Sequence, residues 1–318
     1  MKILVYEWIS AGGLIGRRVP ESLRRDGESM AAALLDDLTA VAGAEVETVR
    51  GEDAWGLDLP VRVWPARSRA ESLARYRALV RECDAVWPVA PETDGVLADL
   101  IGIAASAGAR VVGCSEAAVR LCTSKHATSA ALRAAGIACV PTYRHGDALP
   151  DARGAWVVKP DDGAGCEDTL RVARVADARR LLAAPPRRVA QPWIEGEPMS
   201  LSVLYGNGMS RVLACNRQRI DVERERVSLA GVEIAVDNPR RDPFEALARQ
   251  IGEAIPGLSG FVGIDLVDAE DGPCAIEINP RLTLSYRGLS RALGANVAAA
   301  TLAADPGGSR PAVVPSAG

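Results

Sequence analysis

Histidine, on which many hydrolases depend, is scarce in this sequence. Only two of the 318 residues are histidines, His126 and His145. Zinc hydrolases use histidine ligands, and most catalytic triads use a histidine as the base. The count therefore disfavours both classes. We expect the chemistry to depend on carboxylates, lysines, arginines and a bound metal ion.

Paired cysteines and long apolar runs are also missing. The seven cysteines are odd in number and form no C-x-x-C pair. This pattern disfavours disulfides and a zinc site, and it predicts that the cysteines are reduced core residues of a cytoplasmic protein. No apolar run approaches the ~18 residues that span a bilayer. The opening MKILVYEWIS is interrupted by Glu7 and is too short for a signal peptide. We therefore expect a cytoplasmic chain without a membrane partner.

No excess of one charge marks this chain as a binder of nucleic acid. It has 37 basic and 41 acidic side chains, a net charge of −4, although a local basic patch is compatible with this balance. The apolar fraction of 48% and the charged fraction of 25% are ordinary for a globular protein. At ~100–200 residues per domain, the length predicts two or three domains.

Strands and helices are predicted to alternate through residues 1–114. Strands are expected at 3–6, 46–49, 61–64, 85–89 and 110–114, with helices at 22–41, 70–81 and 95–107. This order predicts a Rossmann-like domain with a parallel sheet and helices on its faces. The glycines after the first strand do not form G-x-G-x-x-G, so the evidence for dinucleotide binding is weak.

Two further units and a tail are predicted after residue 114. Residues 115–190 form a smaller unit with helices at 123–135 and 177–182 and strands at 155–159 and 169–172. Residues 191–304 are rich in strands, at 200–205, 211–220, 260–267 and 273–278, with helices at 243–255 and 288–304. The Pro-, Gly- and Ser-containing tail at 305–318 is predicted to be disordered.

The segment 260–281 predicts a hairpin with two distinct faces. The expected cross-strand pairs are Ile264 with Ile278, Leu266 with Ile276, Asp265 with Glu277, and Gly263 with Asn279. A slip of two residues would keep the same faces. The first two pairs make an apolar face, and the other two place carboxylates and an amide on the opposite face.

The facing carboxylates of Asp265 and Glu277 predict a cation site. Such a pair repels unless a cation lies between them, and the amide oxygen of Asn279 adds a third ligand. Oxygen ligands of this kind suit Mg²⁺, with Mn²⁺ as a substitute. The alternative is a solvated polar face. Because the carboxylates repel, we expect Glu277→Gln to raise the melting temperature without metal.

Two lysines and a hinge are the other candidate ligand-binding elements. Lys159 ends an apolar strand and precedes the glycine-containing loop 160–168, so it is placed to reach phosphates, and Lys125 begins a helix. Ordinary surface charge is the alternative for both. The strand through Gln191–Ile194 breaks at Gly196. The backbone at this break could contact an adenine edge, and Glu197 or Glu195 could then bind the ribose. The alternative is a turn between two strands with surface acids.

In chain order these pieces resemble the ATP-grasp superfamily of carboxylate–amine ligases, over roughly residues 1–300. The E-I-N-P-R element at 277–281, preceded by G-I-D, is the specific part. The resemblance implies an α/β ATP-grasp fold in which ATP is sandwiched between units 115–190 and 191–304. It implies these roles: phosphate binding by Lys125 and Lys159; adenine binding by Gln191, Trp193 and Ile194; ribose binding by Glu197; magnesium binding by Asp265, Glu277 and Asn279.

Three shorter segments indicate a branch of this superfamily. KILVYEWISAGG, PETDG at 91–95 and NRQ at 216–218 resemble the branch that contains the archaeal tyramine–glutamate ligase of methanofuran biosynthesis. The resemblance implies an acyl-phosphate intermediate between a glutamate γ-carboxylate and tyramine. Arg281 would stabilise it, and Arg217 is a second candidate or a surface charge. Glu7 and Glu92 could orient an ammonium group or be loop acids.

Two other functions remain compatible with the same motifs. One is an ATP-grasp ligase for another amino acid or a peptide, with small molecules as its only partners. The other is a non-catalytic ATP-binding module, which would not need the metal residues beside Arg281. The sequence does not rank the substrates, and a homo-oligomer is possible.

Overall fold

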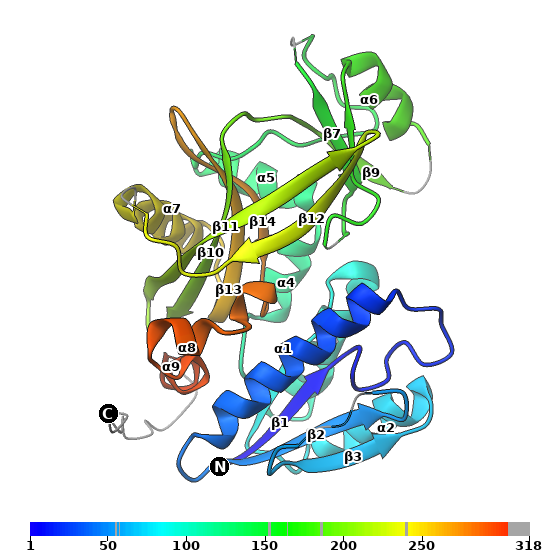
Figure 1. Ribbon diagram of the computed structural model, residues 1–318, viewed down its shortest axis with the longest axis vertical. Helices are drawn as coiled ribbons and strands as arrows, with labels where there is room; N and C mark the ends of the chain where they lie inside the picture. The colour runs from blue at the N-terminus through cyan, green and yellow to red at the C-terminus, as the bar shows by residue number, and fades with distance from the viewer. Residues whose placement is uncertain are drawn as a thin grey trace.

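Two lobes, each built on its own sheet, make up the molecule (Figure 1). The computed structural model describes residues 1–54, 56, 58–151, 154–163, 165–184, 187–238 and 241–304. The tail at 305–318, predicted to be disordered, lies outside the described residues. No helix in the described part is long and apolar enough to cross a membrane.

The N-terminal lobe contains the parallel sheet that the alternating pattern predicts. Its strand order is β3-β2-β1-β4-β5, and every pair is parallel. The strands are β1 (Lys2–Glu7), β2 (Glu45–Gly51), β3 (Arg62–Ala66), β4 (Ala85–Val89) and β5 (Arg110–Val111). Three helices accompany them: α1 (Glu21–Thr39), α2 (Arg69–Leu79) and α3 (Val96–Ser106). The Rossmann-like prediction for this lobe is confirmed.

The second lobe is built on an antiparallel sheet of nine strands in the order β14-β13-β10-β11-β12-β8-β7-β9-β6. One end of this sheet contains β6 (Tyr143–Arg144), β7 (Trp156–Pro160), β8 (Leu170–Val172) and β9 (Arg188–Pro192), with α6 (Val175–Leu182) against them. The other end contains β10 (Glu197–Gly206), β11 (Met209–Glu223), β13 (Gly260–Ala269) and β14 (Gly272–Asn279). The strand β12 (Arg226–Glu233), which the sequence analysis missed, joins the two ends.

Two helices predicted as continuous are each divided in two. The segment predicted at 123–135 contains the end of α4 (Glu116–Thr123) and all of α5 (Lys125–Ala134), and Ser124 between them is extended. Its hydroxyl accepts a hydrogen bond from the amide of Ala127, so it caps α5. The segment 288–304 contains α8 (Leu289–Leu293) and α9 (Val297–Ala304), separated at the left-handed Gly294. The helix α7 (Arg241–Ala254) agrees with its prediction.

The β13–β14 hairpin has the predicted register around its two facing carboxylates. Asp265 pairs with Glu277, and Gly263 pairs with Asn279. The predicted pair of Leu266 with Ile276 is wrong, because a β-bulge after Asp265 shifts the ladder and Leu266 pairs with Ala275. A bulge adds one unpaired residue to one strand. Asp265 and Glu277 lie in the part of the hairpin where the pairing is regular.

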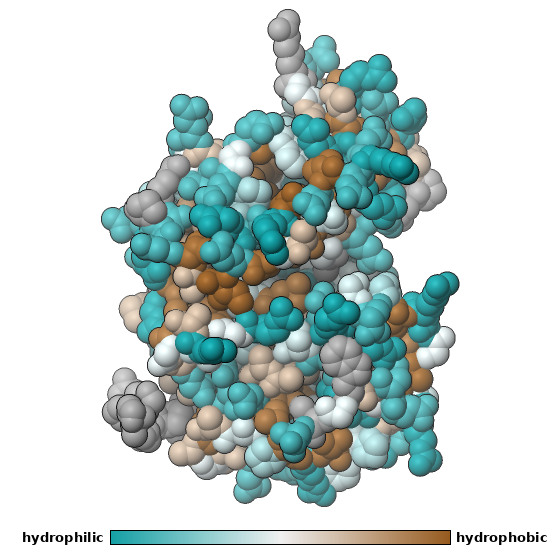
Figure 2. Space-filling model, in the orientation of Figure 1, coloured by the Kyte–Doolittle hydropathy of each residue, from teal (hydrophilic) through white to brown (hydrophobic). Residues whose placement is uncertain are grey.

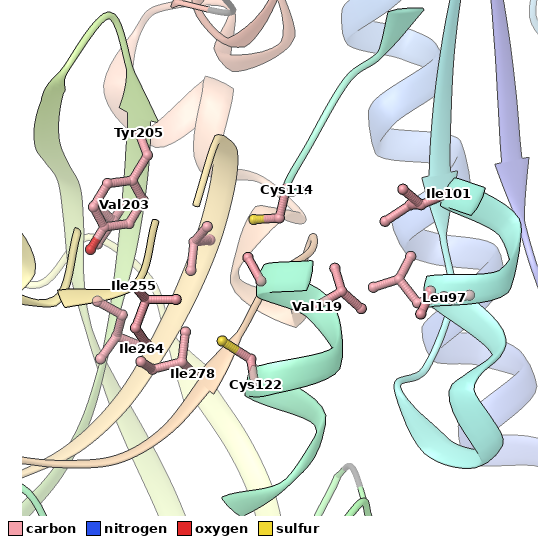
Figure 3. Close-up of a cluster of buried hydrophobic side chains, with 14 of the residues drawn as sticks. Leu97, Ile101, Cys114, Val119, Cys122, Val203, Tyr205, Ile255, Ile264 and Ile278 are labelled. Atoms are coloured by element: carbon pink, nitrogen blue, oxygen red, sulfur yellow. The ribbon is translucent and has the colours of Figure 1, made fainter. Parts of the chain in front are cut away.

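One apolar core crosses the boundary between the lobes. Figure 3 shows Leu97 and Ile101 of α3 on the side of α4 that carries Val119, and Ile264 and Ile278 of the second lobe on the side that carries Cys122. All belong to a single cluster of buried side chains. The predicted units 1–114 and 191–304 therefore share a core, whereas residues 149–190 of the unit 115–190 contain a separate buried cluster.

Candidate active site

A cavity of about 210 Å³ lies against the nine-stranded sheet, between its two ends. The hinge between β9 and β10 forms one wall, and β7 with the loop after it forms another. The floor comes from β11 to β14. The cavity therefore lies where the two units 115–190 and 191–304 meet.

One half of the cavity is apolar. Its lining includes Val157, Trp193, Ile194, Ile220 and Leu229. The backbone amide of Trp193 bonds the Ala155 carbonyl at 2.9 Å, and the Arg171 guanidinium lies 4.8 Å from the Trp193 ring centroid. A slot of this kind suits a flat aromatic ring, such as a purine base. Gln191 is also in the lining, but its amide nitrogen donates to the Thr142 hydroxyl at 2.8 Å.

The other half of the cavity is charged. Lys125 Nζ lies 3.2 Å from Glu277 Oε1, and Lys159 Nζ lies 3.4 Å from Glu277 Oε2. These are two of the three lysines in the chain, and both are buried. Burial lowers the pKa of Lys159, and Glu277 opposes this shift. Although burial alone would raise the pKa of Glu277, the two ammonium groups hold it below its usual value.

Asp265 is the second carboxylate of the cavity and has no lysine partner of its own. It accepts hydrogen bonds from Gln218 Nε2 at 2.9 Å and Asn279 Nδ2 at 3.0 Å. Burial, together with the charge of Glu277, raises the pKa of Asp265 to about 6. The sequence analysis missed Gln218, although it lies within the quoted N-R-Q segment and two positions after Asn216 on β11.

The donor set fits a hard divalent cation that takes its other ligands from elsewhere. The described residues contain no group of three or more His, Cys, Asp or Glu side chains placed to hold a metal by themselves. Two carboxylates and the oxygen of Asn279 suit Mg²⁺, which usually retains water or phosphate ligands. The raised pKa of Asp265 shows that its negative charge is poorly compensated, and a cation would supply that compensation.

Asp161 holds Lys125 in place, and the sequence analysis did not find it. Its carboxylate accepts from the hydroxyl of Ser124 at 2.8 Å and the amide of His126 at 3.0 Å. Its backbone carbonyl accepts from both the amide and the Nζ of Lys125, at 3.1 and 3.3 Å. The loop after β7 is thereby fixed to the first turn of α5. No local pattern could reveal this contact between segments 35 residues apart.

Arg281 lies behind the carboxylates, in contact with the N-terminal lobe. Its Nε and Nη2 lie 2.9 and 2.8 Å from Glu92 Oε2; the Glu92 side chain is buried, and that of Arg281 is 12% exposed. Burial alone would lower the pKa of Arg281, but the charges of Glu92, Glu277 and Asp265 raise it overall. Arg281 does not line the cavity itself.

Arg217 and Glu197 are outside the cavity and bind each other. Arg217 also bonds Glu233 at 3.0 Å, and its side chain is 44% exposed. Because side chains alternate along a strand, Gln218 faces Asp265 while Arg217 faces away. The predicted catalytic role of Arg217 therefore conflicts with its position. Of the two hinge acids, Glu195 lines the cavity and Glu197 does not.

Glu7 has a structural role at the end of β1. Its carboxylate accepts from the amides of Ile9 at 3.1 Å and Ser10 at 2.7 Å. Burial raises the pKa of Glu7 in spite of these bonds. Of the two open interpretations for this acid, the contacts favour the loop acid.

Comparison with known families identifies the chain. A family model described as an ATP-grasp domain matches residues 122–285, and a pre ATP-grasp 3 domain matches residues 45–119. The chain belongs to the ATP-grasp family. Its fold class is therefore that of the ATP-grasp proteins, as the resemblance implied.

Two curated relatives of this ATP-grasp chain are tyramine–L-glutamate ligases. The protein from Methanocaldococcus jannaschii is 31% identical over 201 residues, which are 63% of this chain and 56% of the relative. The protein from Methanocaldococcus fervens is 29% identical over 206 residues, 65% of this chain and 61% of the relative. The matches thus cover less than two thirds of either relative.

Solved structures share the fold along nearly the whole chain. An ATP-grasp superfamily protein from Archaeoglobus fulgidus aligns with a TM-score of 0.73 and 25% identity, covering 95% of this chain and 87% of its own. The VanG D-Ala:D-Ser ligase from Enterococcus faecalis aligns with a TM-score of 0.66 and 16% identity, covering 93% and 96%. The second similarity concerns the fold alone.

Eight of the eleven predicted site residues of this ATP-grasp chain lie together in the cavity lining: Lys125, Lys159, Gln191, Trp193, Ile194, Asp265, Glu277 and Asn279. Three do not line it: Glu197, Arg217 and Arg281. The first two are turned to the opposite face of the sheet. Arg281 lies between the lobes.

Proposed function

We propose that this chain is an ATP-dependent carboxylate–amine ligase that forms an amide through an acyl phosphate, with release of ADP and phosphate. The main support is the contact of Lys125 and Lys159 with Glu277, opposite Asp265, in a cavity whose other half is apolar. That arrangement offers one region for a base and one for phosphates and a cation.

The charged residues divide into two groups by sign. Asp265, Glu277 and Asn279 would hold Mg²⁺, which when bound neutralises charge on the phosphoryl oxygens being transferred. Lys125 and Lys159 would contact the phosphates. Without ligands both ammonium groups are paired with the single carboxylate of Glu277. In this proposal ATP and the cation replace those internal ion pairs.

Neither chemical step requires a histidine. In the first, a carboxylate oxygen attacks the γ-phosphorus, the bond to the β-phosphate oxygen breaks, and ADP leaves. In the second, a neutral amine attacks the acyl carbon, the carbon–oxygen bond breaks, and phosphate leaves with the proton lost by the nitrogen. Arg281 supplies positive charge beside the carboxylates and is our candidate for stabilising the acyl phosphate.

We propose the γ-carboxylate of glutamate and the amine of tyramine as substrates. The support is the similarity to two tyramine–L-glutamate ligases over about 200 residues, together with the segments 2–13, 91–95 and 216–218 that first indicated this branch. Of the two acids considered for the ribose contact, we propose Glu195, which lines the cavity, because Glu197 lies outside it and binds Arg217.

A phosphate-release assay over a matrix of amino acids and amines tests this proposal. ATP and Mg²⁺ are present in every well, and mass spectrometry identifies the amide. We expect release that depends on both glutamate and tyramine. Release with a different pair would keep the ligase and change its substrates. ATP binding without release in any well would contradict the ligase and favour a non-catalytic module.

A further inference from the structure

The carboxylate of Glu92 has one oxygen that no described group satisfies. Its Oε2 accepts from both Nε and Nη2 of Arg281. Its Oε1 is buried and has no hydrogen-bond partner within the described part of the chain. A carboxylate can accept about four hydrogen bonds, and a buried acceptor without a donor is costly. This oxygen is therefore a vacant acceptor in an otherwise satisfied contact.

The position of Glu92 in the fold favours a ligand. It follows β4, which lies beside β1 at the point where the strand order of the parallel sheet reverses. In open α/β sheets, ligands bind outside the carboxyl ends of the strands at such a point. Arg281 reaches Glu92 from just beyond β14, so the contact joins the lobes. Figure 2 shows the surface hollowed between them.

The segment that contains Glu92 is fixed on both sides. Asp94 and Gly95 have φ angles of 57° and 71°, in the left-handed region. The Thr93 hydroxyl donates to the Asp162 carbonyl at 3.1 Å, and the Asp94 amide donates to the Asp162 carboxylate at 3.3 Å. Since Asp162 belongs to the loop after β7, this segment touches both Arg281 and the phosphate side of the site.

The carboxylate of Glu7 differs from that of Glu92 in having a hydrogen-bond donor on each oxygen. Glu7 follows the neighbouring strand β1 and is equally buried, but its two oxygens accept from the amides of Ile9 and Ser10. Its hydrogen bonds are satisfied within its own loop. Glu92 alone of this pair presents an unpartnered oxygen in the described structure.

We propose that Oε1 of Glu92 binds the nitrogen of the amine substrate, which makes Glu92 the residue that selects an amine at the second step. A primary amine supplies N–H donors, and in its ammonium form it also supplies a compensating positive charge. Arg281, on the other oxygen, then lies beside both the amine and the carboxylates of the cavity. This inference rests on the proposed ligase function.

Glu92→Gln tests the inference by replacing the vacant acceptor with a donor; it also removes the charge that pairs with Arg281, which the second measurement below takes into account. The amide oxygen of Gln can still accept from Arg281, while its NH₂ group donates where Oε1 accepted. At saturating ATP and glutamate, we expect the KM for tyramine to rise by about ten- to hundredfold, the scale of one lost charged hydrogen bond. Glu92→Asp keeps the charge and should recover part of the affinity.

A second measurement separates amine binding from the first step. Hydroxylamine, a small and largely neutral nucleophile, traps an acyl phosphate as a hydroxamate without tyramine. We expect Glu92→Gln to form hydroxamate at a rate within a few-fold of wild type, which also shows that the variant is folded. Failure of the wild-type protein to form hydroxamate would contradict the proposed ligase and not the assignment of Glu92.

Glu116→Gln is the matched control, because Arg120 also places its Nε and Nη2 on one oxygen of Glu116, at 2.9 and 2.8 Å, on the surface. It should leave both measurements unchanged. An unchanged KM for tyramine in Glu92→Gln would overturn the inference. If Glu92→Gln lowered hydroxamate formation and amide formation in equal proportion, the inference would also be overturned, because Glu92 would then act only through Arg281.

Discussion

At the scale of single residues, the site is organised around Glu277. Its carboxylate contacts two buried lysines and faces Asp265 across the hairpin. The lysines lower the pKa of Glu277, whereas burial and Glu277 raise the pKa of Asp265 to about 6. The attraction to the lysines therefore outweighs burial at Glu277, whereas at Asp265 the pull of Lys159 does not offset burial and the charge of Glu277. Asp265 is the carboxylate left in need of a cation.

Glu277→Gln is expected to abolish turnover and to lower stability. A lowered pKa means that the folded protein favours the ionised form, so at neutral pH this charge stabilises the fold. We expect a loss of roughly 1–3 kcal/mol at pH 7 without ligands, the scale for leaving a buried polar group unpaired. Calorimetric melting checks it, with the exposed-pair variant Glu253→Gln as the control.

The pH dependence of that loss has a defined sign. As the pH falls through the lowered pKa of Glu277, the wild-type carboxylate is protonated and its contribution disappears, so the two melting temperatures should converge in acid. The higher melting temperature expected from carboxylate repulsion alone is replaced by this prediction, because that reasoning did not include the two lysines. A variant that melts higher at pH 7, or that turns over normally at limiting Mg²⁺, would contradict the assignment.

Lys159→Met should weaken ATP binding by about ten- to hundredfold. A buried contact between a phosphate and an ammonium donor contributes ~1.5–3 kcal/mol. Isothermal calorimetry with ATP and Mg²⁺ measures the change. Lys2→Met is the matched control, since the third lysine forms an ion pair with Glu47 in the other lobe. An unchanged dissociation constant for Lys159→Met would remove this residue from the nucleotide site.

At the scale of elements, the hairpin and the start of α5 at Lys125 were predictable, and the separate helix α4 before it was not. Alternation in a strand fixes which residues share a face, so Asp265, Glu277 and Asn279 could be grouped from the sequence. A bulge leaves no such periodic signal, and the pair of Leu266 with Ile276 was therefore wrong. The break at Ser124 depends on Asp161, which is far away in the chain. Tertiary contacts of this kind decide a helix boundary that local preference leaves open.

Asp161→Ala should affect stability and ATP binding together. Its carboxylate accepts from Ser124 and from the amide of His126 at the first turn of α5, and removal of a helix cap costs about 0.5–2 kcal/mol. The Asp161 carbonyl that Lys125 contacts is kept, but the first turn of α5, which carries Lys125, would be held less firmly. Denaturant unfolding and ATP titration measure both effects. Asp162→Ala is the neighbouring control: within the described residues its carboxylate accepts one hydrogen bond, of 3.3 Å, so the variant should change stability less. Equal effects would contradict the role of Asp161.

At the scale of the whole molecule, the two lobes share their core. The boundary predicted near residue 114 lies inside one buried cluster that joins α3, α4 and the second sheet (Figure 3). Polar contacts add to it: Asp37 of α1 accepts from the hydroxyls of Tyr286 and Ser290, both at 2.6 Å. Composition and chain order could indicate separate units, but only packing shows how far the units depend on each other.

We expect the chain to unfold in a single cooperative transition, although chains of this length often do not. Because α4 packs against both lobes, separating them would expose buried apolar side chains of each. Differential scanning calorimetry is the test, and the calorimetric and van't Hoff enthalpies should agree. Two resolved transitions, or stabilisation of only one of them by ATP and Mg²⁺, would show that the lobes fold independently.

Transfer of an oxygen atom tests the central claim most directly. Glutamate labelled with ¹⁸O in its γ-carboxylate is incubated with the protein, ATP, Mg²⁺ and tyramine, and the released phosphate is analysed by mass spectrometry. An acyl phosphate keeps one carboxylate oxygen bound to phosphorus when the amine displaces it. The account therefore predicts one ¹⁸O atom in each phosphate formed with the amide. Phosphate released without ¹⁸O would contradict it.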